Sequence, residues 1–118
     1  MKVKVVLNEQ HTLLEQQRRV LEEYFGEDFE LELVPIPAKG LTCEEQVDLA
    51  YRLARQAQNW GTIVVASPVP VLLAKLGLLR AIRQFTLYVL ANDRREKVEQ
   101  NGKVFYKIPA DGWRLWAI

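Results

Sequence analysis

Residues 62–91 read TIVVA, then SPVPVLLAKLGLLRAIRQF, then TLYVLA, which is the pattern of a strand, a helix and a second strand. The first and last segments are short apolar runs, typical of strands that are buried on both faces. Ser67 and Pro68 predict the start of the helix, with the serine as N-cap and the proline at the first helical position. The helix predicted over residues 69–85 is apolar nearly all round. It therefore belongs at the centre of the core or against a partner subunit.

The same alternation of strand and helix precedes this unit. Val3–Leu7 is a short β-branched run that predicts the first strand. A helix is predicted from Thr12 to the glycine at position 26, because Thr12 and Glu15 form a capping-box pattern. Phe29–Val34 alternates apolar and acidic residues, which predicts a strand at the edge of a sheet.

Proline and capping patterns place the next two boundaries. Pro35 is expected to end the edge strand, since proline cannot donate to a ladder of hydrogen bonds. Thr42 and Glu45 repeat the capping box and predict a second helix that runs to about Asn59.

The pattern changes after residue 91. Lys97–Gln100 and Lys103–Tyr106 flank Asn101-Gly102, a strong signal for a two-residue hairpin turn. A last strand is predicted over residues 113–118, with Trp113 and Trp116 on opposite faces.

These elements predict an α/β fold in which a mainly parallel sheet carries helices on both faces, as a three-layer sandwich. A C-terminal β-hairpin is predicted as an extension after this core. The chain of 118 residues is expected to form a single domain, with a βαβαβαβ core over residues 1–92 and an extension over residues 93–118.

Composition narrows the class of protein further. No apolar run approaches the length of a transmembrane helix, and the single cysteine, Cys43, precludes an internal disulfide, so a cytoplasmic protein is expected. Dinucleotide-binding, P-loop, metal-ligand and nucleophile-elbow motifs are absent, so no cofactor and no metal site are expected.

The charge distribution is uneven. Residues 1–69 hold 7 Lys and Arg against 11 Asp and Glu, whereas residues 70–118 hold 9 against 4. A basic half in a chain of net charge +1 indicates a local anion site rather than a surface for duplex nucleic acid. The alternative is that the two halves neutralise each other in the fold.

Ligands of open parallel sheets bind beyond the carboxyl ends of the strands. That rule selects residues 8–11, 35–41, 67–70 and 92–97. The last segment places two guanidiniums, Arg94 and Arg95, beside the ammonium of Lys97, and such groups bind phosphate. Alternatively, Asp93 and Glu96 simply pair these cations at the start of a solvated hairpin.

Three other residues are candidates, each with a plainer alternative. Ser67 precedes a helix whose N-terminal dipole favours an anion, although N-capping alone would explain it. His11, the sole histidine, could transfer a proton or be simply solvated. Asn8 in the same loop is a hydrogen-bonding candidate.

The order of elements and several short motifs carry a resemblance. An Asn-containing loop, Asn8-Glu9-Gln10-His11, follows the first strand, and the third strand ends in Ser67-Pro68. The fourth strand ends in Asn92-Asp93-Arg94-Arg95, before Glu99 and the hairpin. In this the chain resembles the small CRISPR-associated Rossmann-fold (CARF-like) proteins of type III systems. These are stand-alone ring nucleases and binders of cyclic oligoadenylate.

The resemblance implies a Rossmann-like fold and a homodimer around a cyclic RNA, with the helix over residues 69–85 as a candidate dimer surface. Cyclic tetra-adenylate is the expected ligand, in antiviral signalling. The implied cleavage needs no metal, because the ribose 2′-hydroxyl attacks the neighbouring phosphate and leaves a 2′,3′-cyclic phosphate. The implied catalytic residues are His11, Arg94, Arg95 and Glu99. The implied ligand-binding residues are Asn8, Gln10, Ser67, Pro68, Asn92, Asp93 and Lys97.

Two other functions remain open from the sequence. The chain could hold the same ligand without cutting it, as a sponge or sensor. It could also be an interaction module that engages protein through its hairpin and C-terminal tryptophans.

Overall fold

The structure, a computed structural model, describes residues 1–57, 61–67 and 69–118. These residues form three helices among seven strands. In chain order the elements are β1 (Lys2–Asn8), α1 (Glu15–Phe25), β2 (Glu30–Ile36), α2 (Cys43–Ala57), β3 (Gly61–Val65), α3 (Pro70–Arg80), β4 (Phe85–Ala91), β5 (Glu96–Gln100), β6 (Lys103–Lys107) and β7 (Arg114–Ala117).

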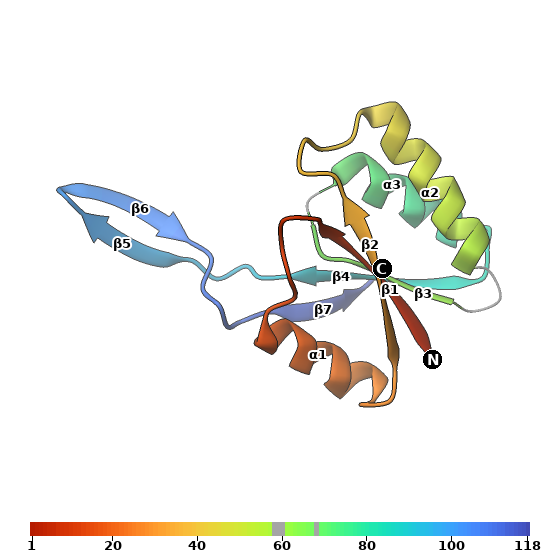
Figure 1. Cartoon of the computed structure of the whole chain (residues 1–118), viewed down its shortest axis with the longest axis horizontal. Coiled ribbons are helices and arrows are strands. Elements are labelled where there is room, and N and C mark those ends of the chain that lie inside the picture. Colours follow the sequence, from red (N-terminus) through yellow and green to blue (C-terminus); the bar gives the residue numbers. More distant parts are fainter. Residues whose placement is uncertain (58–60, 68) are drawn as a thin grey trace.

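The main sheet has five strands in the order β2-β1-β3-β4-β7. Strands β1 to β4 are parallel, and β7 pairs antiparallel with β4 at one edge. Helices α2 and α3 lie together on one face of this sheet, and α1 lies on the other (Figure 1). The prediction of an α/β fold with a mainly parallel sheet and helices on both faces is confirmed.

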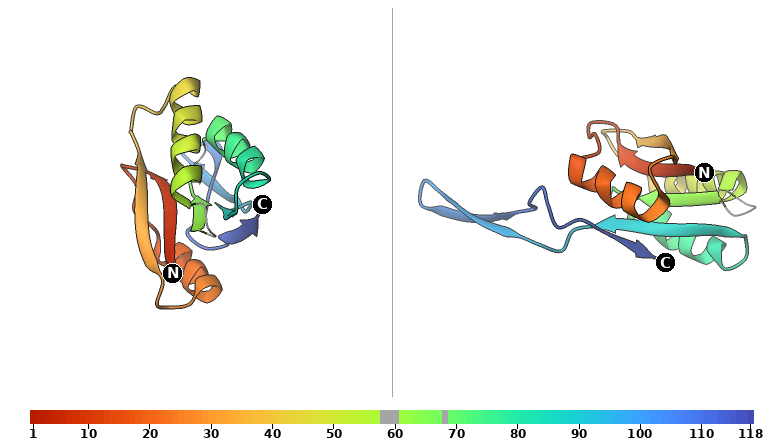
Figure 2. Two further views of the ribbon diagram at one scale, coloured as in Figure 1. Left: turned by 90° about the vertical axis from the view of Figure 1, so that its right-hand side faces the viewer. Right: turned by 90° about the horizontal axis from the view of Figure 1, so that it is seen from below.

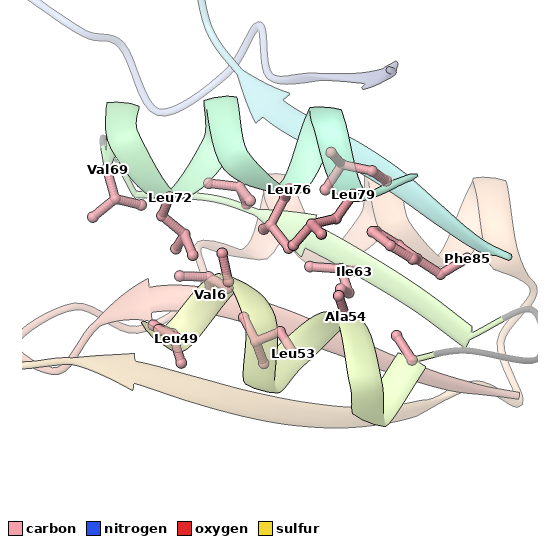
Figure 3. Close-up of a cluster of buried hydrophobic side chains, with 14 of the residues drawn as sticks. Val6, Leu49, Leu53, Ala54, Ile63, Val69, Leu72, Leu76, Leu79 and Phe85 are labelled. Carbon is pink, nitrogen blue, oxygen red and sulfur yellow. The ribbon is translucent and has the colours of Figure 1, made fainter. Parts of the chain in front are cut away.

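Each face of the sheet packs its own apolar core because side chains alternate along every strand. On the face of α2 and α3, Ile63 of β3 meets Leu53 of α2 and Leu76 of α3, all at most 1% exposed (Figure 3). On the face of α1, Val64 packs with Leu21. The central strands β1 and β3 are therefore buried from both sides, as their continuous apolar runs predict, whereas the edge strand β2 is partly exposed.

The β5–β6 hairpin forms a second, separate sheet, named here the arm (Glu96–Lys107). Its turn residues Asn101 and Gly102 have φ angles of 54° and 74°, the positive values of a type I′ turn, so the hairpin prediction is confirmed. The arm projects away from the body of the domain (Figure 2). The radius of gyration is accordingly 15.4 Å, whereas a compact chain of this length would have about 13.5 Å.

Two helix starts were predicted from capping boxes, and one prediction is wrong. At α2, the amide of Glu45 donates to Thr42 Oγ1 over 3.1 Å, and the amide of Thr42 donates to Glu45 Oε1 over 2.9 Å. Those hydrogen bonds to Thr42 lower the pKa of the Glu45 carboxyl. Helix α1 begins at Glu15 rather than after Thr12, because the side chain of Gln17 accepts from the amide of Leu14 over 2.8 Å.

Two other element boundaries predicted from the sequence are wrong. Strand β2 continues through Pro35 to Ile36, which its position at the sheet edge allows, since only one side of an edge strand needs donors. Helix α3 spans Pro70–Arg80 rather than residues 69–85, because β4 begins at the buried Phe85 and the chain must turn before it. The predicted end of the second helix at Asn59 lies outside the described residues.

An ion pair between β1 and β2 predicts a pH dependence of stability. Lys4 lies opposite Glu32 in the parallel register, and its ammonium donates a hydrogen bond to the Glu32 carboxylate. That hydrogen bond lowers the pKa of Glu32 below its usual 4.5. A lowered pKa in the folded state gives stability that is present above the unfolded pKa and is lost as pH falls through the folded value.

We expect Glu32→Gln to cost about 0.5 kcal/mol at neutral pH, because the carboxylate is 43% exposed and solvent screens the pair. The difference from the wild-type chain should shrink as the pH falls through the lowered pKa of Glu32, because the wild-type side chain is then neutral like the glutamine of the variant. Urea denaturation across this pH range measures it, with Glu27→Gln in a loop as the control. A constant difference at every pH would contradict the assigned ion pair.

Candidate functional site

The carboxyl ends of β1, β3 and β4 meet at one edge of the sheet, and the arm leaves the domain from the same edge (Figure 1). A cavity of about 900 Å³, named here the edge cavity, opens there. It is lined by Leu7, His11, Thr12, Leu14, Gln17, Ala66, Glu96, Lys107, Ile108, Pro109, Ala110, Asp111 and Trp113. One wall is thus the β1–α1 loop and the opposite wall is the root of the arm with the 108–113 segment.

Asn8 organises the β1–α1 loop. Its side-chain Oδ1 accepts from the amide of Gln10 over 2.9 Å, and its carbonyl accepts from the amide of His11 over 2.9 Å. Its own amide donates to Ser67 Oγ over 2.7 Å, which ties the end of β1 to the segment after β3. These bonds place His11 on the wall of the edge cavity, while Gln10 is exposed beside it.

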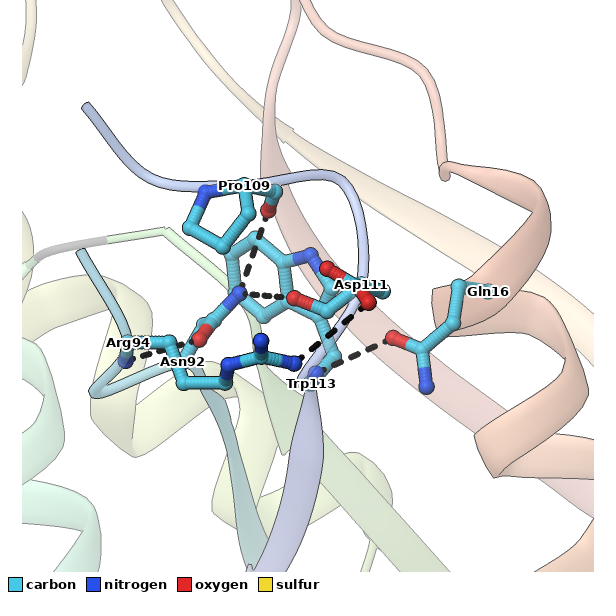
Figure 4. A network of polar contacts seen from close by, with 6 residues as sticks. All are labelled: Gln16, Asn92, Arg94, Pro109, Asp111 and Trp113. Carbon is cyan, nitrogen blue, oxygen red and sulfur yellow. Dashed lines mark hydrogen bonds and ion pairs between the residues drawn. The ribbon is translucent and has the colours of Figure 1, made fainter. Parts of the chain in front are cut away.

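Asn92 organises the opposite wall. It is 7% exposed, and its side-chain amide donates to the carbonyls of Pro109 over 3.2 Å and Asp111 over 2.7 Å (Figure 4). Its Oδ1 accepts from the amide of Arg94 over 3.0 Å. The buried side chain of Asn92 therefore links the segment that leads into the arm to the segment that leads out of it.

Gly112 lets this wall close tightly. Its φ of 89° is a left-handed value that a side chain disfavours, and an added Cβ would lie 2.5 Å from Cδ of Arg94. On the α1 side, the backbone amide of Trp113 donates to Gln16 Oε1 over 3.0 Å. The 109–113 turn is consequently held from both β4 and α1.

The residues after β4 that were predicted to bind an anion have different partners in the structure and do not form one group. Arg94 pairs with Asp111 over 3.4 Å and so reaches the wall of the edge cavity. Arg95 folds back on its own loop, where Nη1 donates to the carbonyls of Asn92 over 3.0 Å and Arg94 over 2.7 Å. Asp93 pairs with Arg114 of β7 over 3.4 Å.

Ser67 does not cap α3. Its hydroxyl accepts from the amide of Asn8, and the residue before the helix is Val69, with Pro70 in the first turn. The amide of Leu72 in that turn donates to Gln46 Oε1 over 3.0 Å, so a neighbouring helix satisfies it. Pro68, also predicted at the site, lies outside the described residues.

Lys97 and Glu99 lie on the arm and do not line the edge cavity. They pair with each other over 3.5 Å on one face of β5. The fold thus places His11 on the wall of the edge cavity and pairs Arg94 with Asp111 of that wall, whereas Glu99 lies outside the cavity.

Of the described residues that line the edge cavity, His11 alone was among the predicted site residues. Glu96, Lys107, Asp111 and Trp113 line the edge cavity, and Glu96 pairs with Lys107 over 3.7 Å. The pairing of Glu96 with Lys107 could have been predicted from the sequence, because a two-residue turn at Asn101-Gly102 fixes the register of the hairpin and sets these two residues opposite each other. Asp111 and Trp113 needed the tertiary contacts of Asn92 and Gln16.

The two C-terminal tryptophans differ in burial, and the last strand begins at Arg114, so Trp113 precedes it rather than lying within it as predicted. Trp113 packs into the core beneath α1, whereas Trp116 is 51% exposed, with the guanidinium of Arg114 4.9 Å from its ring centre. The indole nitrogen of Trp113 is buried without a hydrogen-bond partner among residues 1–57, 61–67 and 69–118.

Within the part of the chain that the structure describes, no three His, Cys, Asp or Glu side chains lie close enough to share a metal ion. None of the described helices combines the length and apolar content needed to cross a lipid bilayer.

No family model, curated protein or solved structure matches this chain. Its own residues and their geometry are therefore what bears on its function.

Proposed function

We propose that this chain is a Rossmann-like, CARF-like protein that binds cyclic oligoadenylate, with cyclic tetra-adenylate as the first ligand to test, in type III CRISPR antiviral signalling. The observation that carries the proposal is the edge cavity, which places His11 and Lys107 on its wall, and Arg94 beside Asp111, at the ligand-binding edge of a parallel sheet.

The lining of the cavity suits a nucleotide. Its apolar part, which includes Leu7, Ile108 and Trp113, offers a surface for a base. Lys107 on its wall, and Arg94 paired with Asp111 of that wall, offer donors for phosphate. A volume of about 900 Å³ is at the upper end for small-molecule sites. It would hold part of a cyclic oligonucleotide, and a second copy of the chain would hold the rest.

A homodimer supplies that second copy in the proposal. The outer side of α3 and the turn after it expose Leu78 at 65% and Ile82 at 81%. Exposed apolar residues of this kind are common at the centres of subunit interfaces. We propose this side of α3 as the dimer surface.

The proposal extends to slow cleavage of the ring without a metal. The ribose 2′-hydroxyl would attack the adjacent phosphorus, the 5′-oxygen would leave, and a 2′,3′-cyclic phosphate would remain. His11 would move the proton, and Arg94 would stabilise the charge that develops on the phosphorane. Arg95, bound to its own backbone, would have to move to reach the cavity. Glu99 lies on the arm outside the cavity and takes no part in the cleavage as proposed.

The test is to incubate the purified chain with labelled cyclic tetra-adenylate in EDTA and to separate bound, intact and cleaved species. We expect retention of the ligand and slow formation of linear products ending in 2′,3′-cyclic phosphate. Arg94→Ala should weaken binding, whereas Lys103→Ala, which removes a charge near the tip of the arm, should not. His11→Ala should keep binding and lose most of the ring opening.

Each alternative outcome has a defined meaning. If the wild-type chain retains the ligand without cleaving it, the chain is a sponge or sensor. In that case the His11→Ala variant would behave like the wild-type chain in this assay. Neither retention nor cleavage, repeated with cyclic tri- and hexa-adenylate, would overturn the proposed ligand.

A second candidate function, protein binding, is favoured by the surface of the arm. The arm and the residue after it expose apolar side chains that the rest of the chain does not cover, namely Val104, Phe105, Tyr106 and Ile108. A two-stranded hairpin is marginally stable by itself in water, and a partner would bury these residues. Loss of self-association in a Phe105→Ser, Tyr106→Ser variant, measured by light scattering, would support this candidate.

A further inference from the structure

Four exposed ion pairs surround the root and sides of the arm, and they divide into two classes. Lys107–Glu96 and Arg94–Asp111 have N–O distances of 3.7 and 3.4 Å, and three of their four residues line the edge cavity. Lys97–Glu99 and Arg114–Asp93 have similar distances of 3.5 and 3.4 Å, but none of their residues lines it.

We propose that Lys107 and Arg94 are the anion-binding residues of the edge cavity, and that Glu96 and Asp111 hold them there until a phosphate displaces the carboxylates. This inference rests on the proposed function for the ligand, and it adds the residues that bind it and the residues that compete with it. Lys107 and both carboxylates are new assignments, since the sequence pointed to Arg95 and Lys97 instead.

The exposure of the pairs makes such an exchange feasible. All four side chains are between 54% and 68% exposed, and ion pairs in such positions contribute little to stability. Each phosphodiester of a cyclic oligoadenylate carries one negative charge, as a carboxylate does, and its two non-bridging oxygens accept paired donors from a guanidinium; the terminal phosphate of AMP carries more charge. The fold also positions both cations before any ligand binds. Lys107 is fixed by the register of the arm, and the backbone of Arg94 is held by Asn92.

The exchange predicts an effect of unusual sign: removing a negative charge from the cavity should tighten the binding of an anion. Glu96→Gln frees Lys107 and is expected to raise affinity by about twofold to fivefold, the range of one exposed ion pair. Lys107→Gln should lower affinity by about tenfold, the loss of one charge-assisted hydrogen bond.

Glu99→Gln is the matched control. It makes the same change on the same strand, three residues away, and also frees a lysine, but outside the cavity. Asp93→Asn is likewise the control for Asp111→Asn. Long-range electrostatics alone would give each variant and its control equal effects.

Calorimetric titrations with cyclic tetra-adenylate, and separately with 5′-AMP and inorganic tripolyphosphate, test the inference at about 50 mM and about 200 mM salt. Tighter binding of an anion by Glu96→Gln than by Glu99→Gln, with a gap that shrinks at higher salt, is the expected result. Circular dichroism melting of each variant establishes that all remain folded.

The possible failures separate the two proposals. Cyclic tetra-adenylate binding with equal responses to Glu96→Gln and Glu99→Gln would overturn the exchange and leave the proposed function standing. Binding of AMP or tripolyphosphate with the expected contrast, but none of cyclic tetra-adenylate, would support the exchange and overturn the proposed ligand. No anion binding by the wild-type chain or by Glu96→Gln would overturn both.

Discussion

Replacing Asn92 with alanine is expected to lower the free energy of unfolding by about 2–3 kcal/mol. The substitution removes a buried side chain that donates to Pro109 and Asp111 and accepts from Arg94. The carbonyl of Pro109 lies in a buried residue, so no solvent replaces the lost donor fully. A polar group left unpaired in this way costs more than the net gain of making the bond.

The same change should loosen the wall of the edge cavity. Asp111 and Trp113 lie on that wall, and the turn that carries them is joined to the end of β4 by Asn92. We therefore expect faster amide hydrogen exchange over residues 109–113 and weaker binding of any ligand of the cavity.

Urea denaturation measures the stability, with Asp93→Ala as the control. Asp93 is the next residue, and its carboxylate makes an exposed ion pair with Arg114. Its removal should change the free energy of unfolding by less than about 0.5 kcal/mol. Equal effects of the two substitutions would show that Asn92 does not hold this wall.

Replacing Leu76 with alanine should cost about 3 kcal/mol of unfolding free energy. Leu76 is fully buried at the centre of α3, among Leu53 of α2 and Ile63 of β3 (Figure 3). Truncation there leaves a cavity that close-packed neighbours on a helix and a strand can fill only in part.

Leu78→Ala on the same helix is the matched control, because Leu78 is 65% exposed. In a monomer its loss should cost less than about 0.5 kcal/mol. In the proposed dimer its loss should instead lower the melting temperature and weaken the dependence of that temperature on protein concentration, which is measured by thermal denaturation at several concentrations. A small effect of Leu76→Ala would contradict the packing of α3 against the sheet.

The elements that were predictable from the sequence are those that a local pattern decides. The apolar run Gly61–Val65 forms a strand because it has no polar face to expose. The type I′ turn at Asn101-Gly102 forms because both residues tolerate positive φ, and its two-residue length alone sets Glu96 against Lys107. The capping box of Thr42 and Glu45 is likewise complete within a few residues.

Several polar groups had more than one possible hydrogen-bonding partner, and only the tertiary structure decided which partner each group binds. Ser67 could cap a helix or accept from the amide of Asn8, and the pairing of β1 with β3 brings that amide within 2.7 Å. The amide of Leu14 donates to Gln17 Oε1, so α1 starts after Thr12 and leaves Thr12 on the cavity wall. Asn92 could face a ligand, yet the return of the chain from the arm gives it two carbonyls to bind.

The candidate site divides in the same way. Sequence alone indicated a polar edge at the carboxyl ends of the strands, with His11 and Arg94 among its residues, because strand direction follows from the alternation of strands and helices. Whether a given cation faces the cavity depended on which carboxylate or carbonyl lay nearest after folding. Arg95 turned to its own backbone and Lys97 to Glu99, whereas Lys107, which no local motif marks, came to line the edge cavity.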